Sequence, residues 1–182
     1  MRRTNSPQRA ADALFAHGDI QPLCVFIEQT LLSIYANRDY LHFNELTLKT
    51  LFLSLLYHNP LYIMDSEPAI QRRYGDLSMI IRPGMRHHSI FDLLFEFKYV
   101  PLKSLMNKPT GNSGALTGEE VKQMSPTDLA ALDAVQVKRD QARSQLQDYR
   151  QMLQKIYGNQ LKLRTYAAVA VGFERLVWEE VD

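Results

Sequence analysis

Hydrophobic residues in the first third of the chain recur every three or four positions, which is the spacing of amphipathic helices. Ser6-Pro7 is a typical helix start and Gly18 a typical helix end. A second helix is expected after Asp19. A third is expected over 41–58, ending at Asn59-Pro60, and it is apolar around much of its circumference. The apolar positions of these two helices are Leu23, Phe26, Ile27, Leu31, Leu32, Ile34, Phe43, Leu46, Leu48, Leu51, Phe52, Leu55 and Leu56.

After residue 60 the pattern changes to short apolar or alternating segments. The predicted elements are a strand at 61–64, a β-hairpin within 74–98, a loop at 101–116, a long helix ending at Tyr157, and strands at 161–171 and 173–181. Strands that follow a long helix suit a crossover onto a mixed sheet. The pattern therefore predicts an α/β fold in layers, with a central mixed β-sheet flanked by helices on both faces. Residues 1–40 are expected to form an N-terminal helical extension or linker, and 41–182 the main domain with an insertion at 101–130.

The hairpin is expected to place two acidic residues opposite each other. The strongest turn signal within it is Arg82-Pro83-Gly84-Met85, because Pro followed by Gly suits the two central positions of a type II turn. If strands 76–81 and 91–96 pair across that turn, Asp76 lies close to opposite Glu96. Directly opposed residues of an antiparallel pair point to the same face, so the two carboxylates are expected to meet.

A lysine is expected to join this pair of acids. Lys98 lies two residues beyond Glu96 on the same strand, so its side chain points the same way, while Phe97 points to the other face. Two carboxylates and an ammonium group on one face of a sheet form an arrangement that can hold a hard divalent cation against a phosphate.

The composition sets modest limits on the function. The chain has 182 residues, enough for one domain with a sizeable core, and 21 basic against 20 acidic residues leave a formal net charge of +1. Nucleic-acid binding would therefore need a local basic patch. A single cysteine, Cys24, excludes a disulfide within the chain. We expect neither a signal peptide nor a transmembrane helix, and the expected location is the cytoplasm.

The order of elements and the pattern Asp76 with Glu96-Phe97-Lys98 resemble the PD-(D/E)XK nuclease superfamily. The closer resemblance is to its bacterial branch that forms the C-terminal domain of AAA-ATPase-like proteins. The position that gives the superfamily name its proline is Gly75 here. Further similar stretches are Ala13-Leu14 with Gly18-Asp19, Asn44-Glu45, Ser66-Glu67, Arg73 to Leu77, Gln145 with Tyr149, and Tyr166 to Trp178. The resemblance implies a three-layer restriction-endonuclease-like fold and a metal-dependent nuclease that acts on nucleic acid, with DNA as the expected substrate.

The resemblance also implies roles for individual residues. Asp76 and Glu96 would bind Mg²⁺ or Mn²⁺, with the Phe97 backbone carbonyl as a third ligand. Lys98 would orient or deprotonate the attacking water, or neutralise charge on the phosphate. Gln145 would reach the site from the long helix.

Glu45 has two interpretations of about equal weight. In some superfamily members an acid of the first helix completes the metal shell, which would make Glu45 a metal ligand. A glutamate in the first turn of a helix is also favoured by the helix dipole, without any metal.

Nucleic-acid contacts are expected from the hairpin and from the long helix. Arg73, Arg82 and Arg86 belong to a basic hairpin that could bind a phosphate backbone. The alternative is ordinary edge-strand charge that discourages aggregation. Tyr149, one helical turn after Gln145, is expected to divide its role between packing and a hydrogen bond near the substrate.

Two rival interpretations belong to other functional classes. The chain could be a catalytically silent nuclease-fold module for interaction or oligomerisation that works with an ATPase partner. An ATPase would have to be a separate protein, because the chain has no G-x-x-x-x-G-K-[ST] motif of its own. The acids and Lys98 could instead form a structural salt-bridge group. A homodimer is a further expectation, since superfamily members that cut both strands often work as dimers.

Overall fold

The computed structural model describes residues 6–34, 43–66, 69–70, 73–105 and 116–182. Its core is a five-stranded mixed sheet in the order β1-β4-β5-β6-β7, and β2 and β3 form a separate two-stranded ribbon. The strands are β1 (Tyr62–Ser66), β2 (Ala69–Ile70), β3 (Arg73–Tyr74), β4 (Leu77–Ile81), β5 (Asp92–Val100), β6 (Leu163–Val171) and β7 (Arg175–Glu180). Only β5 and β6 pair in parallel, and the other neighbours in the five-stranded sheet are antiparallel.

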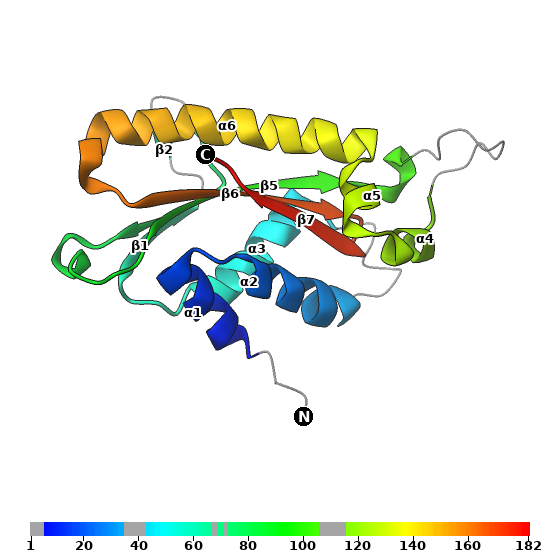
Figure 1. The fold of residues 1–182 in the computed structure, drawn as a ribbon, viewed down its shortest axis with the longest axis horizontal. Coiled ribbons are helices and arrows are strands. Elements are labelled where there is room, and N and C mark those ends of the chain that lie inside the picture. Colours follow the sequence, from blue (N-terminus) through cyan, green and yellow to red (C-terminus); the bar gives the residue numbers. More distant parts are fainter. Residues whose placement is uncertain (1–5, 35–42, 67–68, 71–72, 106–115) are drawn as a thin grey trace.

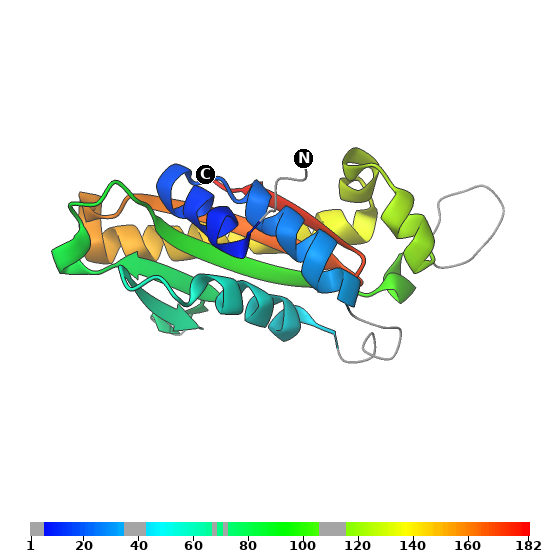
Figure 2. The same ribbon diagram turned by 90° about the horizontal axis from the view of Figure 1, so that it is seen from below.

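Helices cover both faces of the sheet (Figure 1). The helices are α1 (Pro7–His17), α2 (Gln21–Phe26), α3 (Glu45–Leu56), α4 (Gly118–Gln123), α5 (Pro126–Ala130) and α6 (Asp133–Tyr157). The long helix α6 packs on β5 and β6 from one side. Helices α1, α2 and α3 lie over the other side, as the view from below also shows (Figure 2). The predicted α/β architecture in layers is therefore confirmed.

Shorter helical turns connect these elements. A π-helical turn (Ile27–Leu31) and a 3-10 turn (Leu32–Ile34) continue α2, and further 3-10 turns occur at Pro83–Met85, Leu102–Ser104 and Gly158–Gln160. None of the helices within the described ranges is both long enough and apolar enough to cross a membrane.

Local sequence signals explain where several helices begin and end. The Ser6 side chain accepts a hydrogen bond from the Arg9 N–H, and Gly18 ends α1 with a left-handed φ of 70°. Asn44 caps α3, because its side chain accepts the Thr47 N–H and its own backbone N–H donates to the Thr47 hydroxyl in return. The third helix therefore begins at Glu45, later than the expected residue 41.

The N-terminal helices share one hydrophobic core with the sheet. Leu14 and Leu23 are fully buried in the same cluster as Phe95 and Phe97 of β5. The Tyr166 hydroxyl of β6 donates to the Gly18 carbonyl at 2.8 Å. The expected boundary near residue 40 lies in 35–42, outside the described residues.

The turn of the hairpin differs from the expected type II turn. Pro83–Met85 form a 3-10 turn in which the Met85 N–H donates to the Arg82 carbonyl at 2.8 Å. Gly84 is absent from the described glycines with positive φ, which are Gly18, Gly158 and Gly172. The prediction of a type II turn is therefore wrong. The connection from β4 to β5 is ten residues long, so it is not confined to the four-residue turn that the Pro-Gly pair suggested.

Candidate functional site

Asp76 occupies the predicted place opposite Glu96. Leu77 pairs with Phe95 and Met79 with Leu93, so extending this register by one residue sets Asp76 against Glu96. Asp76 itself lies at a bend just before β4. Its carboxylate Oδ2 accepts the Phe97 N–H at 2.7 Å, in place of a backbone ladder bond.

The site forms because β5 extends beyond its neighbour. β4 pairs with β5 only as far as Phe95, while β5 continues to Val100. The backbone N–H groups of Phe97 and Tyr99 therefore face acidic side chains, namely Asp76 and Glu45. The N–H and C=O of one strand residue point to the same side, so the Phe97 carbonyl faces this open edge as well.

Glu96 and Lys98 form a buried ion pair on the face of β5 that α6 covers. The Lys98 Nζ lies 2.6 Å from Glu96 Oε1, and their side chains are only 9% and 4% exposed. Phe97 points to the opposite face, where its ring lies 4.8 Å from that of Phe52 on α3. The alternation of side chains along the strand accounts for both positions, so the predicted arrangement of Glu96, Phe97 and Lys98 is present.

The two acids are close enough to influence each other's ionisation. Burial, and then the charge of Asp76, raise the pKa of Glu96 to about 7, although Lys98 opposes the shift. Burial also raises the pKa of Asp76, while the Phe97 N–H and the ammonium groups of Lys98 and Lys49 act in the opposite direction. A carboxyl group with a pKa near neutrality exchanges its proton under physiological conditions, which is typical of functional sites.

Glu45 reaches the site from the first turn of α3. Its Oε1 accepts the Tyr99 N–H at 3.4 Å and lies 3.9 Å from the Lys138 Nζ of α6. Its negative charge also raises the pKa of Asp76. Glu45 therefore lies in the first turn of α3, as the helix-dipole interpretation requires, and is also close to the site.

Lys49 is a residue of the site that the sequence analysis missed. It lies one helical turn after Glu45, and it is only 4% exposed. It shares a cavity with Asp76, and its charge lowers the pKa of that acid. The available signal was a lysine on the buried stripe of an otherwise apolar helix, next to Leu48 and Phe52.

Of the two α6 residues predicted for the site, Gln145 lines it and Tyr149 lies in the packed layer. Gln145 lines a cavity together with Lys98 and Glu45. Tyr149 is only 3% exposed, and burial raises its pKa to about 12. Its ring lies close to Gly75, where an added Cβ would be 3.3 Å from Leu94 and 3.7 Å from the tyrosine. A side chain at position 75 would therefore crowd Leu94 of β5, while its distance to Tyr149 of α6 would be that of an ordinary contact. The proposed contact of Tyr149 with nucleic acid stays a prediction.

Two hollows flank Glu45 at the open edge of β5. The first has a volume of about 480 Å³ and is lined by Asn44, Glu45, Leu46, Lys49, Asp76 and Tyr99. The second has a volume of about 400 Å³ and is lined by Glu45, Lys98, Lys138, Gln141, Ser144 and Gln145. Glu45 lines both, so the hollows are neighbours: the first lies beside α3, Asp76 and Tyr99, and the second lies between Glu45 and α6.

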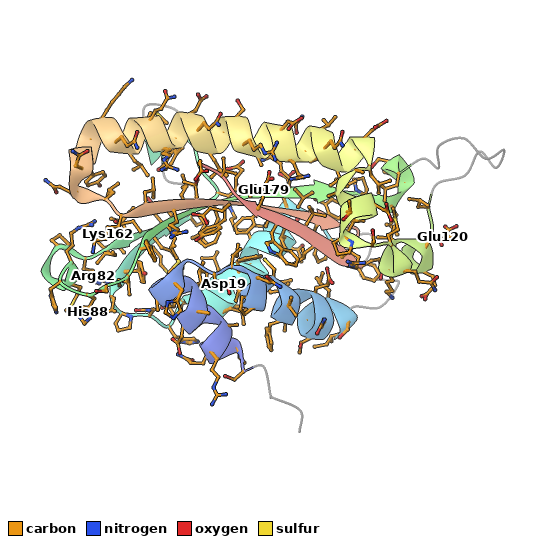
Figure 3. The ribbon with its side chains drawn as sticks, in the orientation of Figure 1. Asp19, Arg82, His88, Glu120, Lys162 and Glu179 are labelled. Atoms are coloured by element: carbon orange, nitrogen blue, oxygen red, sulfur yellow. The ribbon has the colours of Figure 1, made fainter. Side chains whose placement is uncertain are left out.

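Arg82 and Arg86 of the hairpin make structural contacts away from this edge. Arg86 binds the fully buried carboxylate of Asp92 through two nitrogens, each at 3.0 Å. Arg82 donates from Nε to the Pro60 carbonyl at 2.9 Å. In Figure 3, Arg82 lies beside His88 at the end of the molecule opposite Glu120. The side chain of Arg73 lies outside the described residues, so its role stays a prediction, as do the phosphate contacts of Arg82 and Arg86.

The oxygen ligands at this site fit a hard divalent cation that takes only a few of its ligands from the protein. Among the described residues, no group of three or more His, Cys, Asp or Glu side chains is arranged to hold a metal ion. A protein site for Mg²⁺ commonly uses one or two carboxylates and leaves the other positions to water and substrate. Asp76 and Glu96 supply two carboxylates, and the Phe97 carbonyl faces the same edge. This set is compatible with Mg²⁺ or Mn²⁺, and the role of Glu45 as a metal ligand stays a prediction.

Comparisons of this chain with protein-family models, with curated proteins and with solved structures gave no match. The function must therefore be inferred from the side chains that meet at the open edge of β5. Two acids, a backbone carbonyl and a lysine meet there, beside two hollows that share Glu45. This arrangement has the groups needed to bind a cation and an anionic oxygen substrate together.

Proposed function

We propose that this protein is a metal-dependent nuclease that hydrolyses phosphodiester bonds of nucleic acid, with DNA as the expected substrate. The observation that carries the proposal is the convergence of Asp76, Glu96 and Lys98 where β5 extends beyond β4. An antiparallel β4–β5 pair, a helical crossover and a parallel β6 also agree with a restriction-endonuclease-like fold of the PD-(D/E)XK type.

Electrostatics favour a functional site over a structural salt-bridge group. A structural salt-bridge group would stabilise the fold most if both acids were ionised and paired with cations at neutral pH. Glu96 instead has a pKa of about 7, because it is buried beside a second acid. Burying it next to Asp76 costs folding free energy above neutral pH, and a site for a divalent cation offers a reason to keep that cost.

Asp76, Glu96 and the Phe97 carbonyl would hold the cation, Mg²⁺ or Mn²⁺. When bound, it would polarise the scissile phosphate and make water a better nucleophile. The hydrogen bond from the Phe97 N–H keeps Asp76 Oδ2 in place and leaves its other oxygen for the cation. The orientation of Asp76 is therefore set by the backbone of the neighbouring strand.

Lys98 would act on the phosphate and the attacking water. Its ammonium has three N–H donors, and one of them is directed to Glu96 at 2.6 Å. The others can contact a phosphate oxygen or orient water in the hollow that Lys98 lines with Gln145. Gln145 is exposed on the same wall and can bind the same water or a neighbouring phosphate oxygen through its amide.

The proposal extends to the expected surroundings of such an enzyme. The partners would be nucleic acid and an ATPase-like protein, and the enzyme would act in the cytoplasm, as a homodimer if it cuts both strands. The alternative is a catalytically silent module that works with the ATPase partner, and it differs in one measurable respect. A silent module has no need for metal binding at Asp76 and Glu96.

The test is cleavage of plasmid, linear duplex and single-stranded DNA, and of RNA, with Mg²⁺ or Mn²⁺. The variants are Lys98→Ala and Asp76→Asn, because asparagine can still accept the Phe97 N–H while the charge is removed. Lys103→Ala is the matched control, since Lys103 is an exposed lysine just beyond the same strand. We expect the wild type and the control to cleave, and we expect both site variants and EDTA to abolish cleavage.

Two results would contradict the proposal. Cleavage that persists in EDTA or in Asp76→Asn would place the activity elsewhere or in a contaminant. Absence of cleavage in folded protein, together with no stabilisation by Mg²⁺ or Mn²⁺, would favour the silent module. Absence of cleavage with clear metal stabilisation that Asp76→Asn removes would support the site and direct the search to the ATPase partner.

A further inference from the structure

Each of the two hollows beside Glu45 contains a lysine that the proposed chemistry does not use. Lys49 of α3 lines the hollow that contains Asp76. Lys138 of α6 lines the hollow that contains Lys98 and Gln145. The two lysines come from opposite layers of the fold, and Glu45 lines the hollow of each.

Both lysines belong electrostatically to the site. Lys49 is almost completely buried, which is unusual for a lysine, and its charge acts on Asp76. The Lys138 Nζ lies 3.9 Å from Glu45 Oε1, with about a third of its side chain exposed. With Lys98, the site contains three lysines against the three acids Glu45, Asp76 and Glu96. A bound divalent cation would therefore leave the site with a net positive charge toward an incoming anion.

Arg82 and Arg86 of the hairpin are already bound to protein groups, so phosphate contacts are needed from other residues. Arg86 is held by Asp92 and by the Gln160 carbonyl, and Arg82 donates to Pro60. The molecule as a whole carries a net charge of only +1, so its charge alone supplies little attraction for a polyanion. Cations that line the hollows next to the acids are better placed to hold a phosphate backbone there.

We propose that Lys49 and Lys138 are phosphate-binding residues, and that the nucleic-acid backbone crosses the open edge of β5 between α3 and α6. One phosphate contacts Lys49 in the hollow that Asp76 also lines, and another contacts Lys138 in the hollow that Lys98 also lines, next to the scissile phosphate at Asp76 and Glu96. The inference rests on the proposed nuclease function and adds the path of the substrate strand. It moves that path from the hairpin arginines to the cleft beside Glu45.

The experiment measures binding separately from cleavage. Fluorescence anisotropy with a labelled oligonucleotide, single-stranded and duplex, is recorded in Ca²⁺ at 50–200 mM salt, and a gel confirms that the oligonucleotide stays intact. The variants are Lys49→Met and Lys138→Gln. The matched control is Lys155→Gln, an exposed lysine on α6 that lies about 26 Å from Lys138 along the helix.

Each lost phosphate contact lowers the salt dependence of binding by a known amount. We expect the slope of log affinity against log salt to fall by about 0.9 for a duplex, or about 0.7 for a single strand, in each variant. The ratio of wild-type to variant affinity on duplex then shrinks about 3.5-fold between 50 and 200 mM salt. Lys155→Gln should keep the wild-type slope, and Lys49→Arg, which retains the charge, should keep most of it.

The outcomes separate this inference from the nuclease proposal. If the wild type binds or cleaves nucleic acid and both variants keep the full slope, the inference is overturned and the nuclease function stands. If the wild type neither binds nor cleaves nucleic acid and is not stabilised by Mg²⁺ or Mn²⁺, the nuclease function itself fails, and this inference fails with it. A purely structural role for Lys49 would lower the melting temperature of Lys49→Met without changing the slope. If Lys49→Met does not fold, Lys138→Gln alone decides for or against the strand path.

Discussion

Replacing Glu96 by glutamine should make the stability of the metal-free protein less sensitive to a rise in pH from 5 to 8. The substitution keeps the size of the side chain and removes the carboxylate that is buried beside Asp76. The pKa of Glu96 is about 7 in the folded protein, against 4.5 for an ordinary glutamate in the unfolded chain. The folded state therefore binds this proton more tightly than the unfolded state does.

The sign and size of the effect follow from linkage. A raised folded-state pKa gives stability that is fully present below pH 4.5 and is lost as the pH rises through 7. With 1.36 kcal/mol for each pKa unit, the full loss is about 3 kcal/mol, of which roughly 2 to 3 kcal/mol falls between pH 5 and pH 8. Glutamine does not titrate, so Glu96→Gln should not show this loss. The loss of the Lys98 partner lowers the stability of the variant by an amount that changes little over this range.

The assay is urea denaturation of wild type and Glu96→Gln at pH 5 and pH 8, with EDTA present. The measured quantity is the unfolding free energy of the variant minus that of the wild type. We expect this difference to be roughly 2 to 3 kcal/mol more favourable to the variant at pH 8 than at pH 5. Glu119→Gln is the matched control, because Glu119 is an exposed glutamate of α4. The control should follow the wild-type curve.

One result would refute the reasoning about this site. If wild type and Glu96→Gln lose or gain stability in parallel between pH 5 and pH 8, Glu96 ionises like an exposed glutamate. The two carboxylates of Asp76 and Glu96 would then not be confined together beside the start of β4. The metal-site proposal would lose its electrostatic support, whatever the outcome of the cleavage assay.

Three further predictions address the core, the hairpin and the metal. Phe52→Ala should lower the unfolding free energy by about 4 kcal/mol in urea, because the ring is fully buried against two phenylalanines of β5, and a smaller loss would mean a looser core. Arg86→Met should lower the unfolding free energy by about 3 kcal/mol, because buried Asp92 loses its cationic partner. The variant should still show any increase in melting temperature that Mn²⁺ gives the wild type. Loss of that increase would connect the hairpin to the site. Asp76→Asn should instead remove the increase in melting temperature with Mn²⁺. In the wild type, a metal concentration 100-fold above Kd corresponds to a stabilisation of about 2.7 kcal/mol. An unchanged increase in the variant would place the metal elsewhere.

The arrangement on β5 could be predicted from the sequence because it depends on local periodicity. Side chains alternate along any strand, so Glu96 and Lys98 had to share a face and Phe97 had to take the other. The antiparallel register that sets Asp76 opposite Glu96 also followed from the position of the turn, even though the type of turn was predicted wrongly. A change of turn type that keeps the register leaves the facing pairs intact.

The remaining residues of the site depended on contacts between distant segments. No spacing rule relates Lys49 or Glu45 of α3 to Asp76, since their meeting depends on how α3 packs against β5. The hairpin arginines show the converse case. Their sequence position suggested a basic surface, but Arg86 is directed to a buried acid that lies six residues further along the chain.

By itself, the sequence determined the helices and most strands, the hairpin register and the acid-and-lysine face, because these follow from repeats of two or of three to four residues and from capping residues. Only the tertiary structure decided that α1 and α2 join the same core as the sheet, and that Glu45, Lys49 and Lys138 surround the open edge of β5. The physical reason is that burial is shared between segments far apart in the chain. Which polar group is then buried beside which depends on the packing of whole layers, and no local pattern records it.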